Sequence, residues 1–250
     1  MHRFYVSSPG PRGDTLQLVG REAHHAVQVL RVREEERVLV LDGAGHELAC
    51  VVRGRERHSV SLEVLERKFI PAPPCSITLI QAIPKGKIIE SIIQKATELG
   101  VSRIVPLLSE RVVTQLDADD AEAKAEKWQA VAIEAIKQCG SAWLPKVEAP
   151  VTLPSLLQRA EKFELSLVAC LESGSRPTRD YFQEFSARHP LLPQSVAVWI
   201  GPEGDFSAAE YGAIKGSGAQ PITFGPLVLR VETATICALA VINSELQGRS

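Results

Sequence analysis

The chain has 250 residues, of which 45% are apolar, and its formal net charge is −2. This size supports a sizeable core and fits one large domain or a small domain joined to a medium one; we expect two. The near-neutral charge argues against indiscriminate coating of nucleic acid, because such binding depends on neutralising phosphates. No stretch approaches the roughly 20 apolar residues of a membrane span, and the start, MHRFYVSSPG, lacks the apolar core of a secretory signal. We therefore expect a cytosolic protein.

Charge is unevenly distributed along the sequence. Residues 1–70 and 71–116 are slightly basic, whereas residues 117–250 hold 12 Lys and Arg against 17 Asp and Glu. Most of the histidines also precede residue 70. The first third therefore carries either a modestly basic binding surface or ordinary solvated charge.

The cysteines are scattered, with no C-x-x-C pair and no histidine at metal-ligand spacing. They are Cys50, Cys75, Cys139, Cys170 and Cys237. We predict reduced thiols in the core and no metal site.

Residues 4–65 alternate short β-rich runs with turns. The runs VLVLDG, ELACVVRG and SVSLEVLE predict strands, with a turn signal at Asp42-Gly43, and a small barrel is the natural way to close them. The segment REAHHAVQVLRV predicts a helix at 21–32 with alanine, valine and leucine on one face.

The segment Ile70-Pro71-Ala72-Pro73-Pro74 breaks helix and strand alike, because proline lacks an N–H and restrains its neighbours. We place a domain boundary there. The expected domains are residues 1–70 and 74–250.

Beyond the boundary, strand-like and helix-like runs alternate, which is typical of a largely parallel α/β sheet covered on both faces. CSITLIQAI, VSRIVPLL, LSLVACL and SVAVWIG predict strands, and GKIIESIIQKATELG predicts a helix that ends at Gly100. The spacing of apolar residues predicts two more helices, one over 128–139 and one from about 233 to 246.

Three loops follow predicted strands, which is where ligands bind in open α/β sheets. They are VWIGPEGDF at 198–206, FGPLVLRVETA at 224–234 and CLE at 170–172. Glycines there let a ligand approach the backbone, whose free N–H and C=O groups recognise an adenine edge better than a phosphate. A single Gly-Pro-x-Gly loop is better explained as a plain tight turn, but two glycine loops at successive strand ends favour a ligand site.

Other site motifs lack support. The sequence has no G-x-x-x-x-G-K-[ST] loop, and the nearest approach to G-x-G-x-x-G, Gly43-Ala44-Gly45, lies between two predicted strands and fits a hairpin turn. No Gly-x-Ser-x-Gly elbow or His-Glu-x-x-His motif supports a hydrolase or a zinc enzyme.

Several segments together resemble the RsmE family of 16S ribosomal RNA uridine N3-methyltransferases, in the SPOUT superfamily. They are RFYV followed by HHAVQVLRV, KGKIIESIIQKATELGVSRIVPLLSERV at 85–112, IGPEGDFS near 200 and FGPLVLRVETA near 230. The resemblance covers nearly the whole chain in order. It implies a PUA-like RNA-binding barrel followed by an α/β domain with a trefoil knot. It also implies a homodimer, S-adenosylmethionine bound within the knot, and 16S rRNA of the small subunit or its precursor as substrate.

The resemblance carries over to particular residues. The implied cofactor-binding residues are Leu171, Ile200, Gly201, Pro202, Glu203, Gly204, Phe224, Gly225, Leu227, Val228, Leu229, Thr233 and Ala234. The candidates for RNA contact are Arg3, His25, Arg31, Lys85 and Lys87, while the acidic linker around Asp117, Asp119 and Asp120 is expected to face away from RNA. Arg31 at a helix C-terminus is also favourable for dipole reasons.

Arg230 is the catalytic candidate. A sulfonium already supplies the leaving group, so the protein must position the reactants and help uridine N3 lose its proton. A guanidinium is a poor base, but it stabilises an anion on the uracil carbonyls; the alternative is an ion pair with Glu232. We expect Thr233 to cap the last helix through its hydroxyl. Glu203 either binds substrate or secures its own turn.

The chain departs from the family pattern at three positions. Ser141 stands where an arginine usually follows Gln-Cys-Gly, Asp205 where many members have a second glycine, and Leu227 where a basic residue is common. With fewer cations, the expected attraction between the protein and RNA phosphates is weaker. Two alternatives therefore stay open: a non-catalytic RNA-binding or ribosome-assembly factor, and an α/β enzyme that binds another adenine nucleotide. The intact glycine loops and Arg230 argue against the first, and the missing phosphate motifs argue against the second.

Overall fold

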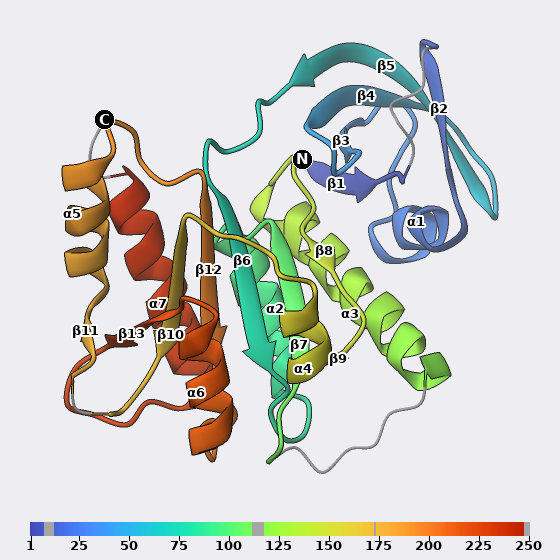
Figure 1. Ribbon diagram of the computed structural model, residues 1–250. Coiled ribbons are helices and arrows are strands. Elements are labelled where there is room, and N and C mark those ends of the chain that lie inside the picture. Colours follow the sequence, from blue (N-terminus) through green and yellow to red (C-terminus); the bar gives the residue numbers. More distant parts are fainter. Residues whose placement is uncertain (8–12, 112–117, 173, 248–250) are drawn as a thin grey trace. The chain divides into compact units, whose positions relative to one another are not determined.

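The computed structural model describes residues 1–7, 13–111, 118–172 and 174–247 (Figure 1). The chain divides into two compact units, the first formed by Met1–Ala72 and Ile133–Leu144 and the second by Pro73–Ala132 and Pro145–Ser250. The break after Ala72 lies within the proline segment. Residues 133–144 belong to the first unit, although residues 133–139 are the last part of a helix whose earlier residues belong to the second. The local sequence pattern does not indicate this division.

The first unit contains a five-stranded sheet that curls into a half-barrel. Its strands, in spatial order, are β1 (His2–Tyr5), β3 (Arg37–Leu41), β4 (His46–Arg55), β5 (Ser59–Phe69) and β2 (Thr15–Val19). β1 runs parallel to β3, and the remaining pairs are antiparallel. Two register shifts between β4 and β5 bend these long strands, as β-bulges do. The sequence predicted β3, β4 and β5 and missed the short edge strands β1 and β2.

The predicted helix at 21–32 is shorter and less regular than expected. It begins as α1 (Gly20–His24), continues as a π-helix, η1 (His25–Val29), and is followed by Arg31 with a φ of 53°. Ala23 and Ala26 are fully buried and pack with Phe4 and Val40 in the core of this unit. The hairpin turn expected at residues 43–45 is confirmed: Oδ1 of Asp42 accepts hydrogen bonds from the N–H groups of Ala44 and His46.

The second unit is built on a parallel sheet. Its main strand order is β11 (Arg176–Pro177), β13 (Gln220–Thr223), β10 (Leu165–Ala169), β12 (Ser195–Ile200), β6 (Ser76–Ala82), β7 (Arg103–Leu108) and β8 (Lys146–Val147), with β9 (Val151–Thr152) also paired to β7. Residues 77–82 of β6 are all buried, because helices cover both faces. The predicted parallel α/β fold is therefore confirmed.

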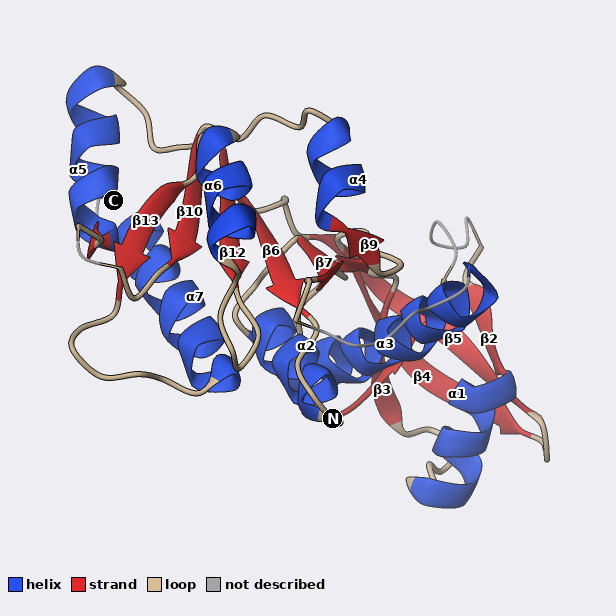
Figure 2. Cartoon of the chain, turned by 60° about the horizontal axis from the view of Figure 1, so that its bottom comes forward, coloured by secondary structure: helices blue, strands red, loops and turns tan. Residues whose placement is uncertain are grey.

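Helices lie on both faces of this sheet (Figure 2). They are α2 (Ile88–Glu98), α3 (Ala118–Cys139), α4 (Leu153–Gln158), α5 (Thr178–Arg188), α6 (Ala208–Gly216) and α7 (Val231–Gln247). α4 and α6 pack on one face, where Ile80, Trp199 and Ile214 share a core cluster. α2 and α7 pack together on the opposite face. None of the helices in the described ranges is long and apolar enough to cross a membrane.

Two expectations need correction. Asp119 and Asp120 do not form a linker; they lie in the first turn of α3, where negative side chains complement the helix dipole. Asp117 lies outside the described residues. The five cysteines are free thiols, but only Cys50, Cys75 and Cys170 are buried: Cys237 is half-buried, and Cys139 is exposed because it is the last residue of α3.

Candidate functional site

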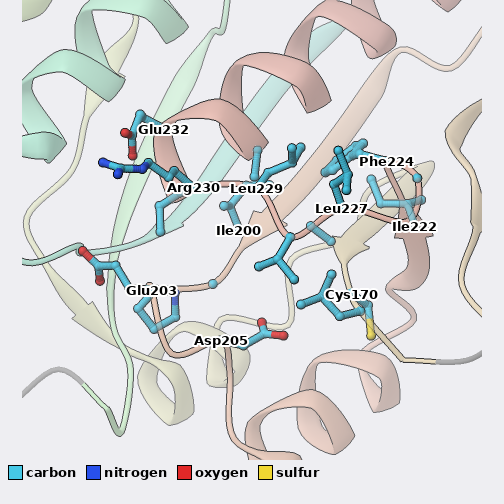
Figure 3. Close-up of a pocket in the computed structure, with 18 of the residues that line it drawn as sticks. Cys170, Ile200, Glu203, Asp205, Ile222, Phe224, Leu227, Leu229, Arg230 and Glu232 are labelled. Carbon is cyan, nitrogen blue, oxygen red and sulfur yellow. The ribbon is translucent and has the colours of Figure 1, made fainter.

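A pocket of about 400 Å³ opens at the carboxyl ends of β10, β12 and β13, which are neighbours in the sheet (Figure 3). This volume falls within the usual range for sites that bind small molecules. The lining residues are Ile88, Ala169, Cys170, Leu171, Ile200, Gly201, Pro202, Glu203, Asp205, Ile222, Phe224, Gly225, Leu227, Val228, Leu229, Arg230, Val231, Glu232 and Ala234. The three loops singled out in the sequence thus meet at one cavity.

The first wall is the turn after β12. This strand is buried along most of its length and gives way to Gly201 and Pro202, after which the N–H of Asp205 donates to the Pro202 carbonyl at 2.8 Å. A Cβ added at Gly201 would stand only 2.8 Å from Oδ1 of Asp205 and 3.2 Å from the Phe206 nitrogen. Glycine is therefore required here by close packing of the turn on itself.

The second wall is the segment between β13 and α7. Gly225 has a φ of 109° and donates its N–H to the Thr223 hydroxyl at 3.2 Å, which starts the turn. Leu227 and Val228 then leave 73% and 78% of their surfaces exposed beside the cavity. Exposed apolar side chains next to a pocket are typical of ligand contacts.

Arg230 stands at the start of α7 with an unpaired side chain. Its carbonyl accepts the first helical hydrogen bond, from the N–H of Ala234 at 2.8 Å, so Arg230 is the residue that precedes the helix. Within the described parts of the chain, its guanidinium makes no ion pair or hydrogen bond, although Glu232 lies near it in Figure 3. The predicted alternative, a structural ion pair with Glu232, is not formed.

The capping role predicted for Thr233 is wrong. α7 begins at Val231, two residues earlier than the sequence suggested, so Thr233 lies inside the first turn and is exposed. A hydroxyl inside the first turn cannot cap the helix N-terminus, as the hydroxyl of the residue just before the helix does.

Glu203 and Gly204 tie the first wall to neighbouring segments, and of the two only Glu203 lines the cavity. Oε1 of Glu203 accepts the backbone N–H of Lys85 at 2.9 Å, which ties the turn to the loop between β6 and α2. The contact secures the turn, as one of the two expected roles has it, but through a neighbouring loop; substrate binding by Glu203 stays a prediction. The Gly204 carbonyl accepts a hydrogen bond from the Arg111 guanidinium.

Tyr211, in α6, connects the turn after β12 with the end of β10. Its hydroxyl lies 2.6 Å from Oδ1 of Asp205 and 2.8 Å from the carbonyl oxygen of Ala169, at the end of β10. Burial, followed by the hydrogen bond with Asp205, raises the pKa of this phenol well above its usual range. Tyr211 therefore stays protonated and keeps a donor available to the carboxylate.

Most of the cofactor-binding residues expected from sequence line this one pocket. The exceptions among them are Gly204 and Thr233. Lining residues of two kinds were not predicted from the sequence. Cys170 was signalled by its place at a strand end, whereas Ile222 belongs to a four-residue strand that contains a proline and gives no clear pattern.

Two RNA candidates in the first unit have structural partners. The Arg3 guanidinium donates to the carbonyls of Lys137 and Gln138 at 3.2 and 2.9 Å, which satisfies the C-terminal end of α3. The His25 ring packs edge-on against Phe4, with their centroids 6.4 Å apart. RNA contact by Arg3 and His25 stays a prediction.

Arg31 lines an open pocket of about 460 Å³ on the first unit, together with Arg55, Arg57 and one carboxylate, Glu56. Its backbone takes the left-handed conformation after η1, which is usually a glycine position. Arg55 donates to the Val32 carbonyl at 3.0 Å. Three exposed guanidinium groups at one pocket suit the binding of phosphates. Arg55 and Arg57 were not predicted from the sequence, because only tertiary structure brings residues 31 and 55–57 together.

The remaining expectations concern Lys85, Lys87, Ser141 and metal binding. Lys85 and Lys87 are exposed in the loop before α2. The Ser141 hydroxyl donates to the Trp143 carbonyl at 2.9 Å and accepts its N–H at 3.2 Å, so it stabilises its own turn. Among the described residues, no group of three or more His, Cys, Asp or Glu side chains is arranged to hold a metal ion.

Comparisons with known proteins agree with this geometry. Residues 71–243 match the model of an RNA methyltransferase domain, and residues 18–65 match that of the RNA methyltransferase PUA domain. The protein is thus an RNA methyltransferase by class. More particularly, the chain belongs to the ribosomal RNA small subunit methyltransferase E family. It is 32% identical to the Bacillus subtilis member over 99% of this chain and 98% of that protein, and 31% identical to the Aquifex aeolicus member over 97% and 99%.

Solved structures support the same assignment. A methyltransferase from Legionella pneumophila, determined with S-adenosylmethionine bound, is 32% identical and covers 97% of this chain and 96% of its own, with a TM-score of 0.86. A ribosomal RNA small subunit methyltransferase E from Neisseria gonorrhoeae, also bound to S-adenosylmethionine, is 29% identical over 98% and 97%, with a TM-score of 0.85.

Proposed function

We propose that this protein uses S-adenosylmethionine to methylate N3 of a uridine in the RNA of the small ribosomal subunit. The observation that carries the proposal is the pocket at the ends of β10, β12 and β13, which has a volume usual for small-molecule sites and is lined by the unpaired Arg230. Family membership and the two relatives solved with S-adenosylmethionine support the choice of cofactor. The proposed substrate places the reaction in the cytosol.

The residues present fit this cofactor. Backbone groups of the turn at Gly201 and of the segment 224–229 offer hydrogen bonds to an adenine edge, while Leu227, Val228 and Leu229 provide apolar contact. S-adenosylmethionine supplies an activated methyl group. The walls contribute by holding the reacting groups in line and by limiting water around them.

Arg230 acts on the uracil in this mechanism. Loss of the N3 proton leaves a negative charge shared with the uracil carbonyl oxygens, and a guanidinium that is always protonated stabilises that charge as it develops. Because Arg230 has no protein partner within the described residues, it needs no rearrangement to serve the substrate.

We further propose that RNA phosphates bind at the Arg31, Arg55 and Arg57 pocket of the first unit and at Lys85 and Lys87 of the second. Residues 1–70 would act as the PUA-like RNA-binding domain and residues 74–250 as the methyltransferase domain. The family resemblance also supports a trefoil knot around the cofactor loops and a homodimer, which light scattering of the purified protein tests directly.

One assay tests the proposed function. The protein is incubated with methyl-labelled S-adenosylmethionine and small subunits that lack the modification, and the RNA is digested and analysed by mass spectrometry. The expected product is N3-methyluridine at one position. Cofactor binding without any methylated product would favour the non-catalytic RNA-binding factor, and no cofactor binding would contradict the proposal outright.

A further inference from the structure

We propose that Asp205 is an anionic subsite that binds a positively charged centre of the methyl donor, either its sulfonium or its α-ammonium group. The inference rests on the proposed function, because it concerns how this pocket distinguishes among related ligands. Of the carboxylate residues that line the pocket, Asp205 alone has its backbone in the left-handed region.

Asp205 has a φ of 61°, in the left-handed region that favours glycine. Aspartate and asparagine tolerate this conformation better than most side chains, so the backbone alone does not demand a charge. A glycine or an asparagine would serve the turn equally well. Strained positions that persist beside a ligand pocket point to a function for the side chain.

The carboxylate is held rigidly by one of its oxygens. Oδ1 of Asp205 accepts the N–H of Phe206 at 2.9 Å and lies 2.6 Å from the Tyr211 hydroxyl. A hydroxyl has one proton, and the carboxylate is a stronger acceptor than the Ala169 carbonyl, so Tyr211 donates to Asp205. Both hydrogen bonds of this side chain within the described residues use Oδ1, which leaves Oδ2 available to a ligand.

Asp205 lines the cavity and is only partly buried. Figure 3 shows its carboxylate among the lining side chains, on the side of Cys170 and apart from Arg230. The positive charge expected to face the uracil and the negative charge of Asp205 therefore lie in different parts of the pocket. This separation suits a cofactor that carries its own positive charge.

No protein cation neutralises this carboxylate. Within the described parts of the chain, Asp205 forms no ion pair, and Arg230 is the only basic residue among those that line the cavity. The Glu203 carboxylate is already engaged by the Lys85 N–H, and Glu232 lies beside Arg230. A partly buried carboxylate without a counter-ion is stabilised by a cationic ligand group.

Two centres of the methyl donor meet this requirement. Once the N3 proton of uridine has been released to water, the lone pair of N3 forms the new bond to the methyl carbon, and the electrons of the broken carbon–sulfur bond stay on sulfur. The donor's sulfonium thereby becomes a neutral thioether, whereas its α-ammonium is unchanged. A carboxylate next to sulfur therefore strengthens binding of the donor but not of the product, S-adenosylhomocysteine. A carboxylate next to the α-ammonium strengthens binding of both.

The test compares three ligands by titration calorimetry on the full-length protein: S-adenosylmethionine, S-adenosylhomocysteine and 5′-methylthioadenosine, which lacks both charges. Asp205→Asn keeps an oxygen that accepts from Phe206 and Tyr211 but removes the charge. We expect it to weaken S-adenosylmethionine binding about tenfold and to leave methylthioadenosine unchanged. Unchanged S-adenosylhomocysteine affinity would identify the sulfonium as the partner, and an equal loss would identify the α-ammonium.

Two further variants separate charge from structure. Tyr211→Phe removes the hydroxyl that positions the carboxylate, and it should weaken the charged ligands while the Asp205 charge remains. Glu184→Gln is the matched control, since it removes a carboxylate of α5, outside the pocket lining, that already pairs with Arg176 at 2.7 Å. It should leave all three affinities unchanged.

The inference fails if Asp205→Asn binds S-adenosylmethionine as the wild type does. It also fails if methylthioadenosine loses as much affinity as S-adenosylmethionine, because the carboxylate would then act only on the shape of the turn. Wild-type protein that binds none of the three ligands would overturn the proposed function as well.

Discussion

The Thr235 hydroxyl donates a hydrogen bond of 2.7 Å to the side-chain oxygen of Gln81, and both side chains are buried. Gln81 lies near the carboxyl end of β6, and Thr235 lies in the second turn of α7. The bond therefore fixes the start of α7 against the sheet. Since Arg230 immediately precedes that helix, a contact outside the pocket determines where the catalytic candidate stands.

Replacing Thr235 with valine should lower the free energy of unfolding by about 1–3 kcal/mol, because it leaves the buried Gln81 oxygen without a donor. Urea unfolding measures the change. Thr235→Ser retains the hydroxyl and should lose less. A valine variant as stable as the wild type would show that the amide finds another donor.

Gly201→Val should abolish cofactor binding, since the first added carbon would already stand 2.8 Å from Oδ1 of Asp205. The matched control is Gly212→Ala in α6, where an added Cβ meets nothing within 4 Å. That variant should bind the cofactor normally and gain about 0.5–1 kcal/mol of stability from better helix propensity. Calorimetry gives the affinities, and undiminished binding by Gly201→Val would remove this turn from the site.

The sequence predicted the elements with strong apolar patterning; it missed the short strands, the helices α4, α5 and α6, and the first half of α3. α2 is evident from its isoleucine spacing, and β6 from a short run rich in isoleucine and leucine. β13 and β11 have four and two residues, too few for a periodicity to emerge. β13 forms because β10 offers it an edge, and β11 forms because β13 does; such long-range pairing leaves no local pattern.

The candidate site, too, was predictable only in part. Glycine loops after buried strands indicated where a ligand approaches the backbone, and those loops meet at one pocket. The partners of individual side chains were not predictable. Glu203 bonds to Lys85 and Tyr211 to Asp205 only because the fold brings separate loops together. The capping error at Thr233 arose because helix ends are the least certain feature of a sequence pattern.

The exposed Cys139 should be the thiol that reacts first with a maleimide at pH 8. Burial raises the pKa of both Cys50 and Cys75 to about 11, so little of either thiol is ionised there, and both are also inaccessible. Labelling followed by peptide mass spectrometry should show Cys139 modified in minutes and the buried thiols only on unfolding. If Cys139→Ser retained the fast phase, another cysteine would have to be the accessible one.

Arg31→Gln and Arg57→Gln should each weaken binding of small-subunit RNA and reduce the slope of log affinity against log salt by about 0.7 to 0.9, if each guanidinium contacts one phosphate. Arg53→Gln is the control, because that guanidinium already pairs with Glu35 and Glu63. It should change the slope less. Equal slopes for all variants and the wild type would place the RNA elsewhere on the protein.

Arg230→Ala should separate catalysis from cofactor binding. The side chain is exposed and has no protein partner within the described residues, so its removal should leave folding and S-adenosylmethionine affinity near wild type. Methylation should fall about 100- to 1000-fold in single-turnover assays, the usual cost of losing one donor to a developing anion. Arg230→Lys keeps a positive charge without the planar guanidinium, and its methylation rate should lie between those of the wild type and the alanine variant. Near-normal turnover by the alanine variant would exclude Arg230 from the mechanism, while parallel losses of rate and cofactor affinity would make it a cofactor contact instead.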